Sequence, residues 1–362
     1  MKKYKICKIL LVILAIFLCV AFYELLGICV AYKKQPEVSN TTKKETKNGS
    51  WNECSENTER AVIIEKNPEA LLQRVRLIKN AKKEIILSTF AFQSDESGKL
   101  ILGALHDAAD RGVHIRLLVD GMESWIDMEG NPYFYGLSSH ENVEIKLYNK
   151  ANPLKPWKMM GRMHDKYLIA DGKRYILGGR NTYNYFLGDF PGHKNYDRDV
   201  LVVCDEPEKE NSVNQLLEYF ETIWEQEDSG YFHDNKKLAN RKSVKNAVLE
   251  LQNGYQKYFE ENKERICDTD YTDETFETEK IALVSNPIHT GPKEPVVWYQ
   301  LGELMKNAKE RVKIHTPYII CNDMMYNTWK EIAERVPDFS IMTNSVANNG
   351  NPFGSADYAR NR

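Results

Sequence analysis

The chain has 362 residues, of which 42% are hydrophobic and 28% are charged, and its formal net charge is −3 at pH 7. This length allows two ordinary domains or one large duplicated domain with a sizeable core. Because basic and acidic residues are nearly balanced, the composition argues against a dedicated nucleic-acid-binding protein, which usually has a basic excess. The seven cysteines lack the spacing of a metal site or a disulfide framework.

An apolar segment from Ile9 to Tyr32 follows lysines near the N-terminus and is interrupted only by Glu24. As a helix rising about 1.5 Å per residue, it is long enough to cross a hydrocarbon core of ~30 Å. A cleaved signal peptide is the alternative, but its apolar core is usually shorter. We expect residues 1–34 to form a single-pass anchor in the cell membrane, with the rest of the chain on the extracytoplasmic side. Lysines on both sides of the segment weaken the orientation signal.

Residues 35–60 are polar and poor in apolar side chains, so we expect a flexible tether. Residues 61–230 alternate between helical and strand patterns, as in an α/β sheet with short crossovers. The expected elements are a helix from Asn67, capped by Asn67 itself with Pro68 in its first turn, a strand 84–92, a helix 97–111, strands 114–119 and 143–148, a hairpin, a strand 199–204 and a helix 212–224. Residues 231–275, rich in Lys and Glu, predict a polar helical connector with a solvated face.

The hairpin lies between Arg162 and Asn181. His164 and Lys166 are two positions apart, so a strand would project both from one face, with Leu168 and Ala170 behind them. Asp171-Gly172 separates two strand-forming runs, as in a tight hairpin turn that requires positive φ. The second run, from Arg174 to Leu177, leads into Gly178-Gly179, where missing side chains would let a ligand or backbone come close.

A histidine beside a lysine suits attack on a phosphodiester. Neutral imidazole can attack phosphorus or move a proton, and an ammonium group neutralises charge on phosphate oxygens. The alternative is a surface hairpin whose His164 and Lys166 are solvated and whose Asp171 only begins the turn. Spacing alone does not exclude that alternative.

The longer pattern is more specific. His164-x-Lys166-x4-Asp171 followed by Gly178-Gly179-Arg180-Asn181 resembles the signature of the phospholipase D superfamily. The run that begins at Arg162, with Tyr185-Phe186 after it and the strand start Asp197-Arg198-Asp199-Val200, is similar to the cardiolipin synthase branch. The resemblance implies a phospholipase D-like α-β-α sandwich.

An internal repeat is also present. The run 77–82, followed by a strand, recurs as 304–309, and Ala109-Asp110-Arg111 recurs as Ala333-Glu334-Arg335 at a similar offset. This order predicts a duplicated fold whose second repeat occupies residues 276–362. The family's second catalytic motif would follow beyond Arg362, so we expect this sequence to be a truncated piece of a longer protein.

The resemblance implies a two-step displacement in which two histidines flank one phosphate and no metal or cofactor takes part. It assigns these residues: His164 as nucleophile, Lys166 and Asn181 as phosphate ligands, Asp171 as a supporting carboxylate, and Gly178 and Gly179 as substrate-binding through close approach. The expected reaction joins two phosphatidylglycerol molecules into cardiolipin, and no nucleic-acid partner is expected. The alternatives are phospholipid hydrolysis, a phosphodiesterase or nuclease, and an inactive half-site that needs its missing half or a homodimer partner.

Overall fold

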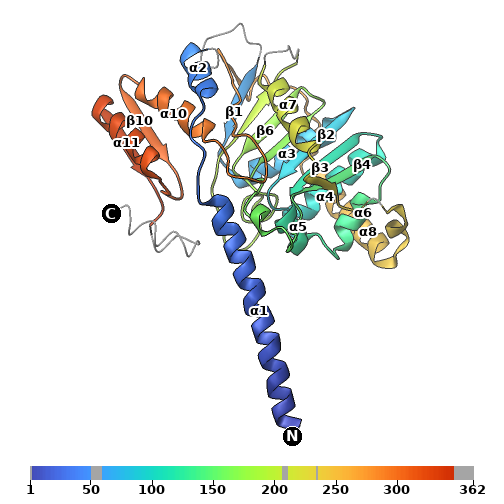
Figure 1. Cartoon of the computed structure of the whole chain (residues 1–362). Helices are drawn as coiled ribbons and strands as arrows, with labels where there is room; N and C mark the ends of the chain where they lie inside the picture. Colours follow the sequence, from blue (N-terminus) through green and yellow to red (C-terminus); the bar gives the residue numbers. More distant parts are fainter. Residues whose placement is uncertain (1, 50–58, 206–210, 234, 346–362) are drawn as a thin grey trace. The chain divides into compact units, whose positions relative to one another are not determined.

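The computed structural model describes residues 2–49, 59–205, 211–233 and 235–345. The chain divides into two compact units (Figure 1). The first comprises residues 1–34, 52–283 and 288–292, and the second comprises residues 35–51, 284–287 and 293–362. Each unit is described by itself.

The first unit is built on a nine-stranded mixed sheet with the order β8-β4-β3-β2-β5-β6-β7-β1-β9. Strands β2, β3 and β4 are parallel, and every other pairing in this sheet is antiparallel. The strands are β1 Arg60–Ile64, β2 Glu84–Thr89, β3 His114–Asp120, β4 Val143–Tyr148, β5 Lys166–Ala170, β6 Arg174–Gly178, β7 Asp199–Val203, β8 Ser229–Tyr231 and β9 Phe276–Glu277.

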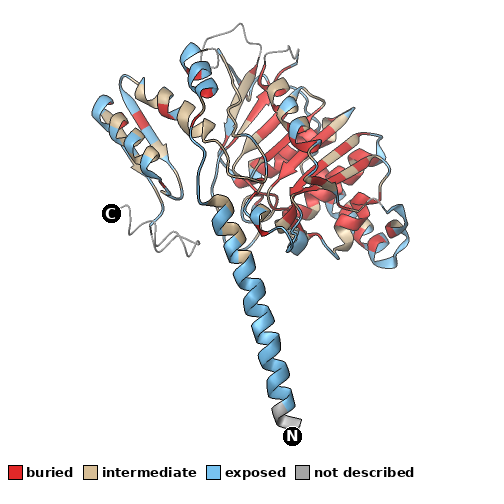
Figure 2. Ribbon diagram, in the orientation of Figure 1, coloured by how far each residue is buried: buried red, intermediate tan, exposed pale blue. Residues whose placement is uncertain are grey.

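Helices cover both faces of this sheet. They are α3 Asn67–Asn80, α4 Glu96–Asp110, α5 Gly121–Asp127, α6 Pro132–Ser138, α7 Ser212–Trp224, α8 Lys242–Glu261 and α9 Lys263–Cys267, with short 3-10 helices η1 Pro156–Lys158 and η2 Lys236–Asn240. Leu168 and Ala170 of β5 pack with α3, α4, α6 and α8, whereas Tyr167 and Ile169 pack with α7. The central strands β2, β5 and β7 are accordingly almost entirely buried (Figure 2). The expected α-β-α sandwich is confirmed.

The N-terminal segment forms one long helix, α1, from Lys2 to Tyr32. Its residues Lys5–Tyr32 have a mean hydropathy of 2.9 and are long and apolar enough to cross a membrane. The apolar side chains from Ile9 to Phe22 are not covered by other parts of the protein, as expected for a helix that packs against lipid.

The expected cap of α3 was wrong by one residue. Lys66 occupies the N-cap and makes no side-chain capping bond. The Asn67 side chain is used elsewhere: its amide nitrogen donates to the carbonyl of Asn195 at 2.9 Å, and its oxygen accepts from Arg180 Nε at 3.1 Å. A long-range contact has therefore overridden the local capping preference of asparagine.

Part of the expected tether is helical. The second unit contains α2, Asn40–Asn48, which the polar composition did not predict. The Ser39 hydroxyl accepts from the backbone N–H of Thr42, and Gly49 closes the helix at φ 72°. Both ends are thus capped by residue types with strong capping preferences. The prediction of a tether considered only the lack of apolar residues and overlooked these capping residues.

The expected solvated connector instead belongs to the first unit. Helix α8 packs against α4 and α6 and buries one apolar stripe. The members of that stripe recur at helical spacing: Val244, Ala247, Leu251, Tyr255 and Phe259. The charged residues of α8 line the remaining faces, so its overall polarity concealed an amphipathic helix.

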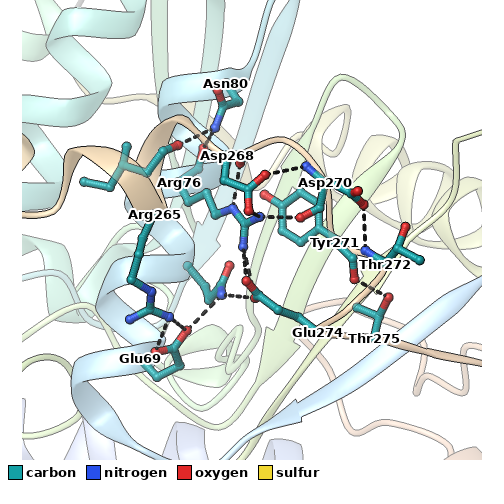
Figure 3. A network of polar contacts seen from close by, with 12 residues as sticks. Glu69, Arg76, Asn80, Arg265, Asp268, Asp270, Tyr271, Thr272, Glu274 and Thr275 are labelled. Carbon is teal, nitrogen blue, oxygen red and sulfur yellow. Dashed lines mark hydrogen bonds and ion pairs between the residues drawn. The ribbon is translucent and has the colours of Figure 1, made fainter.

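The chain after α9 is fastened to α3 by the network in Figure 3. The Arg76 side chain, only 1% exposed, pairs with Glu274 at 2.9 Å and with Asp268 at 3.2 Å. It also donates to the backbone carbonyl of Asp270 at 2.7 Å and lies over the ring of Tyr271. This network makes residues 268–275 part of the first unit.

The second unit repeats an arrangement found in the first. Its elements after α2 are α10 Val296–Lys306, β10 Arg311–His315, α11 Asp323–Arg335 and β11 Asp338–Met342, and the two strands are parallel. The order helix, strand, helix, strand is that of α3, β2, α4 and β3, whose strands are also parallel. This correspondence agrees with the repeat in the sequence. Residues 346–362 lie outside the described part of the chain.

Candidate active site

The candidate site lies at one end of β2 and β5, which are antiparallel neighbours. Lys166, the first residue of β5, is opposite Thr89, the last residue of β2. His164 precedes the strand and is exposed, whereas Lys166 is 6% exposed. The expectation that both residues belong to one strand was therefore wrong for His164.

His164 and Lys166 still lie on the same side of the chain. The Phe90 ring, just after β2, meets the imidazole of His164 edge to face, with 4.5 Å between ring centroids. The same ring lies 5.3 Å from the Lys166 ammonium nitrogen. That ammonium also donates to the backbone carbonyl of His164 at 2.7 Å. Phe90 thus positions both groups.

The surroundings lower the pKa of both groups. The side chain of His164 keeps part of its surface in contact with solvent, but neighbouring groups exclude water from the rest, and this desolvation is the largest cause of its lowered pKa. The positive charge of Lys166 adds to it, and the pKa is lowered to about 4. Burial also lowers the pKa of Lys166, to about 8, although the nearby carboxylates of Asp165 and Asp197 oppose the shift. At neutral pH the imidazole is therefore neutral and can act as a nucleophile, while the ammonium remains charged.

The backbone before His164 is held by Asp120, which we did not predict. Asp120 ends β3, is 1% exposed, and accepts from Arg162 Nη2 at 2.6 Å and Nε at 2.9 Å. It also accepts from the backbone N–H of Met163 at 3.0 Å. One carboxylate therefore fixes Arg162 and Met163, the two residues that precede His164. The available sequence signal was an acidic residue at the end of a buried strand.

Asn181 reaches the same end of β2. Its side-chain oxygen accepts from the backbone N–H of Ala91 at 3.3 Å, and the residue is 7% exposed. Ala91 follows Phe90, so the structure brings Asn181, Phe90, His164 and Lys166 together. A role for Asn181 in binding phosphate stays a prediction.

Gly178 and Gly179 allow Asp199, the first residue of β7, and Asp197, which precedes β7, to come close. A Cβ on Gly178 would lie 2.0 Å from Asp199 Oδ1, and a Cβ on Gly179 would lie 2.1 Å from Asp197 Oδ2. The close approach expected from these glycines is thus made by the protein's own chain. Their contact with substrate stays a prediction.

The structure does not bring Asp171 to the other site residues. It follows the far end of β5, about 16 Å along the strand from the end that carries Lys166. Its carboxylate accepts from the backbone N–H groups of Lys82, Lys83 and Glu84 at 2.7–3.0 Å. Asp171 and Gly172 have φ of 55° and 63°, as the hairpin turn requires. These contacts favour a structural role for Asp171, and the expected supporting role in catalysis stays a prediction.

We expect Asp171→Ala to lower stability by about 1–2 kcal/mol, because three backbone donors lose a charged acceptor and alanine disfavours positive φ. Turnover per folded molecule should stay within about twofold of wild type. Denaturant midpoints and rates normalised to folded protein would test this. A large loss of turnover in stably folded protein would return Asp171 to the catalytic site.

Among the described residues, no three His, Cys, Asp or Glu side chains gather as a metal site would require. A metal-free reaction stays a prediction from the resemblance.

The candidate site lies in a part of the chain that is similar to known proteins. A family model described as "Cardiolipin synthase, PLD-like domain" matches residues 74–224. An uncharacterized protein of Helicobacter pylori (strain 26695) is 28% identical over 315 residues, which are 79% of this chain and 59% of that protein. Cardiolipin synthase C of Escherichia coli K12 is 29% identical over 171 residues, which are 43% of this chain and 34% of that enzyme.

A solved structure extends the likeness in fold. The crystal structure of phosphatidylserine synthase from Haemophilus influenzae Rd KW20 matches 83% of this chain and 66% of its own chain, with a TM-score of 0.55 and 14% identity. The chain spans about three fifths of the length of the Helicobacter relative. Residues 74–224 therefore carry a phospholipase D-like domain of the cardiolipin synthase type.

Proposed function

We propose that this protein is a membrane-anchored phosphatidyltransferase that makes cardiolipin from two molecules of phosphatidylglycerol. The observation that carries the proposal is the neutral, exposed imidazole of His164 beside the charged ammonium of Lys166, in a domain of the cardiolipin synthase type. Members of this superfamily act on phosphodiesters, and relatives of this chain are named cardiolipin synthases.

In the first step, an imidazole nitrogen of His164 attacks the phosphorus of phosphatidylglycerol. A P–N bond forms, the P–O bond to glycerol breaks, and glycerol leaves after taking up a proton. Lys166 and Asn181 bind the phosphoryl oxygens as charge develops on them. In the second step, a hydroxyl of another phosphatidylglycerol attacks the phosphohistidine, loses its proton and regenerates the imidazole.

The leaving glycerol needs a proton donor. His-x-Lys occurs once in the 362 residues, at His164. We propose that the donor is a second histidine, supplied either by a segment outside this sequence or by a second copy of the chain. By itself, the 362-residue chain is then expected to have little activity.

The reaction can be tested with the full-length protein in vesicles of phosphatidylglycerol. Glycerol and cardiolipin should appear in equal amounts, and phosphatidate should stay near background. Phosphatidate in place of cardiolipin would identify the hydrolase, our second candidate, for which water is the acceptor. In a parallel reaction with an added oligonucleotide, cleavage of the oligonucleotide together with no lipid product would point to the nuclease alternative.

We propose an N-terminal anchor with an extracytoplasmic catalytic domain. The long apolar helix α1 supports the anchor. Cys267 is exposed and outside α1, so it can report the orientation. A membrane-impermeant maleimide should label it in intact cells, and labelling only after lysis would place the domain inside.

The two pKa values predict a bell-shaped pH dependence for the first step. The rate should rise as pH increases through about 4, where His164 loses its proton, and should fall above about 8, where Lys166 loses its charge. In Lys166→Arg, the residual rate should keep the acid limb, but its alkaline limb should move upward because arginine stays protonated.

The matched control is Lys173→Arg on the same hairpin, which should leave both limbs unchanged. Lys173 is exposed and bonds a backbone carbonyl far from His164. An alkaline limb that does not move in Lys166→Arg would assign that limb to another group.

A further inference from the structure

The loop between β4 and β5, residues 149–161, packs against the C-terminal part of α1. The Tyr23 hydroxyl donates to the backbone carbonyl of Leu154 at 3.0 Å. Gly27 lies so close to Pro156 that a Cβ would be 2.5 Å from the proline ring. The level of this loop along α1 is therefore fixed within the first unit.

That level corresponds to a lipid–water interface. Lys5–Tyr32 would extend about 42 Å as a helix, longer than a hydrocarbon core of ~30 Å, so its ends lie among the headgroups. Glu24 marks where the uninterrupted apolar run ends, and the loop contacts the residues on either side of it. If α1 spans the bilayer, the loop lies at its surface.

The loop and the neighbouring helix α5 expose large apolar side chains. Leu154 is 76% exposed, Met160 56% and Trp157 46%. Trp125 and Ile126 of α5 are exposed by 68% and 72%. The two segments are neighbours, because α5 residue Met122 and loop residues line one cavity. Exposed aromatic and apolar residues of this kind are typical of surfaces that enter a membrane interface.

The charge of the loop favours anionic lipid. Residues 149–161 contain Lys150, Lys155 and Lys158 and no acidic residue. Lys158 pairs with Asp228 outside the loop, whereas Lys155 is exposed. Basic residues beside exposed apolar ones are the combination that binds an anionic membrane surface.

We propose that residues 149–161 and α5 form a second membrane contact, which docks on the anionic lipid–water interface beside α1. His164 follows the loop by three residues, about 10 Å of extended chain. Docking therefore holds the imidazole close to the level of the lipid phosphates. The inference rests on the anchor of the proposed function and is independent of its chemistry.

Tryptophan quenching by brominated lipids tests the contact in the full chain, reconstituted into nanodiscs that contain phosphatidylglycerol. We expect Trp125→Phe/Trp157→Phe to lose at least about half of the quenchable emission. The matched control is Trp224→Phe, because Trp224 is buried between α7 and the sheet. Trp224→Phe should lower the total tryptophan emission but leave unchanged the emission that brominated lipids quench. Equal quenchable emission in the double variant and wild type would overturn the contact.

The charge component is tested by Lys155→Glu, with Lys245→Glu on the exposed side of α8 as control. Lys155→Glu should reduce quenching of the loop tryptophans in phosphatidylglycerol discs and have little effect in phosphatidylcholine discs. An equal effect in both lipids would overturn the preference for anionic lipid.

Flotation of wild type after alkaline extraction separates this inference from the anchor. Protein that floats but shows no loop quenching overturns the loop contact alone. Protein that is extracted overturns the anchor and the loop contact together. Either result leaves the His164 chemistry to the product assay.

Discussion

His164→Ala is expected to lower the rate of cardiolipin formation by at least about 10³-fold, because the variant lacks the group that bonds to phosphorus. Folding should be preserved. His164 is exposed, it precedes β5, and its ring contacts the ring of Phe90. The effect should therefore appear in turnover and not in the denaturant midpoint. Glycerol release from phosphatidylglycerol vesicles is the measurement.

The matched control is His233→Ala, a surface histidine that pairs with Glu129 in the same unit. It should retain nearly full activity. A second measurement follows the intermediate: with short-chain phosphatidylglycerol and an alkaline denaturing quench, the His164 peptide should gain a phosphatidyl group in wild type. Turnover within about tenfold of wild type in His164→Ala, or a modified peptide elsewhere in the chain, would remove His164 from the role of nucleophile.

The local elements of the fold could be predicted because their signals are local. The strand 143–148 and the helix 212–224 were predicted with the bounds that the structure has, from apolar periodicity and strand-forming residues. The hairpin turn followed from Asp171-Gly172, whose backbone lies at positive φ. Each of these features depends on residues close together in the sequence.

The remainder depends on contacts between distant residues. Nothing near Met163 in the sequence indicates that Asp120 accepts its backbone N–H. The motif suggested catalysis for Asp171, but its carboxylate is used by the backbone donors before β2. Asn67 had the local preference of a helix cap and is instead bound to Arg180. A sequence pattern names residue types, whereas burial and long-range partners decide which role each one has.

The buried charge cluster behind Gly178 carries the largest expected effect on stability. Asp199 begins β7, and one of its carboxylate oxygens lies 3.0 Å from Arg74 Nη1 and 3.3 Å from Arg180 Nη1. The side chains of Asp199 and Arg180 are 0% exposed, and that of Arg74 is 5% exposed. Burial is the largest cause of a lowered pKa for Arg180, which the charge of Asp199 opposes. The Asp199 carboxylate therefore offsets the cost of burying the two guanidinium groups.

Asp199→Asn should lower the free energy of unfolding by about 3–5 kcal/mol, because the cluster changes from a charge of about +1 to about +2 with no counterion. Arg74→Met is the informative comparison: it leaves one Asp199–Arg180 pair and an apolar side chain of similar length, and should cost about 2 kcal/mol or less. Hydrogen exchange of peptides from β6 and β7 in the full chain measures the loss of stability in each variant at the strands next to the cluster. Equal losses in the two variants would mean that packing around Asp199, and not the balance of buried charge, sets the stability of this edge of the site.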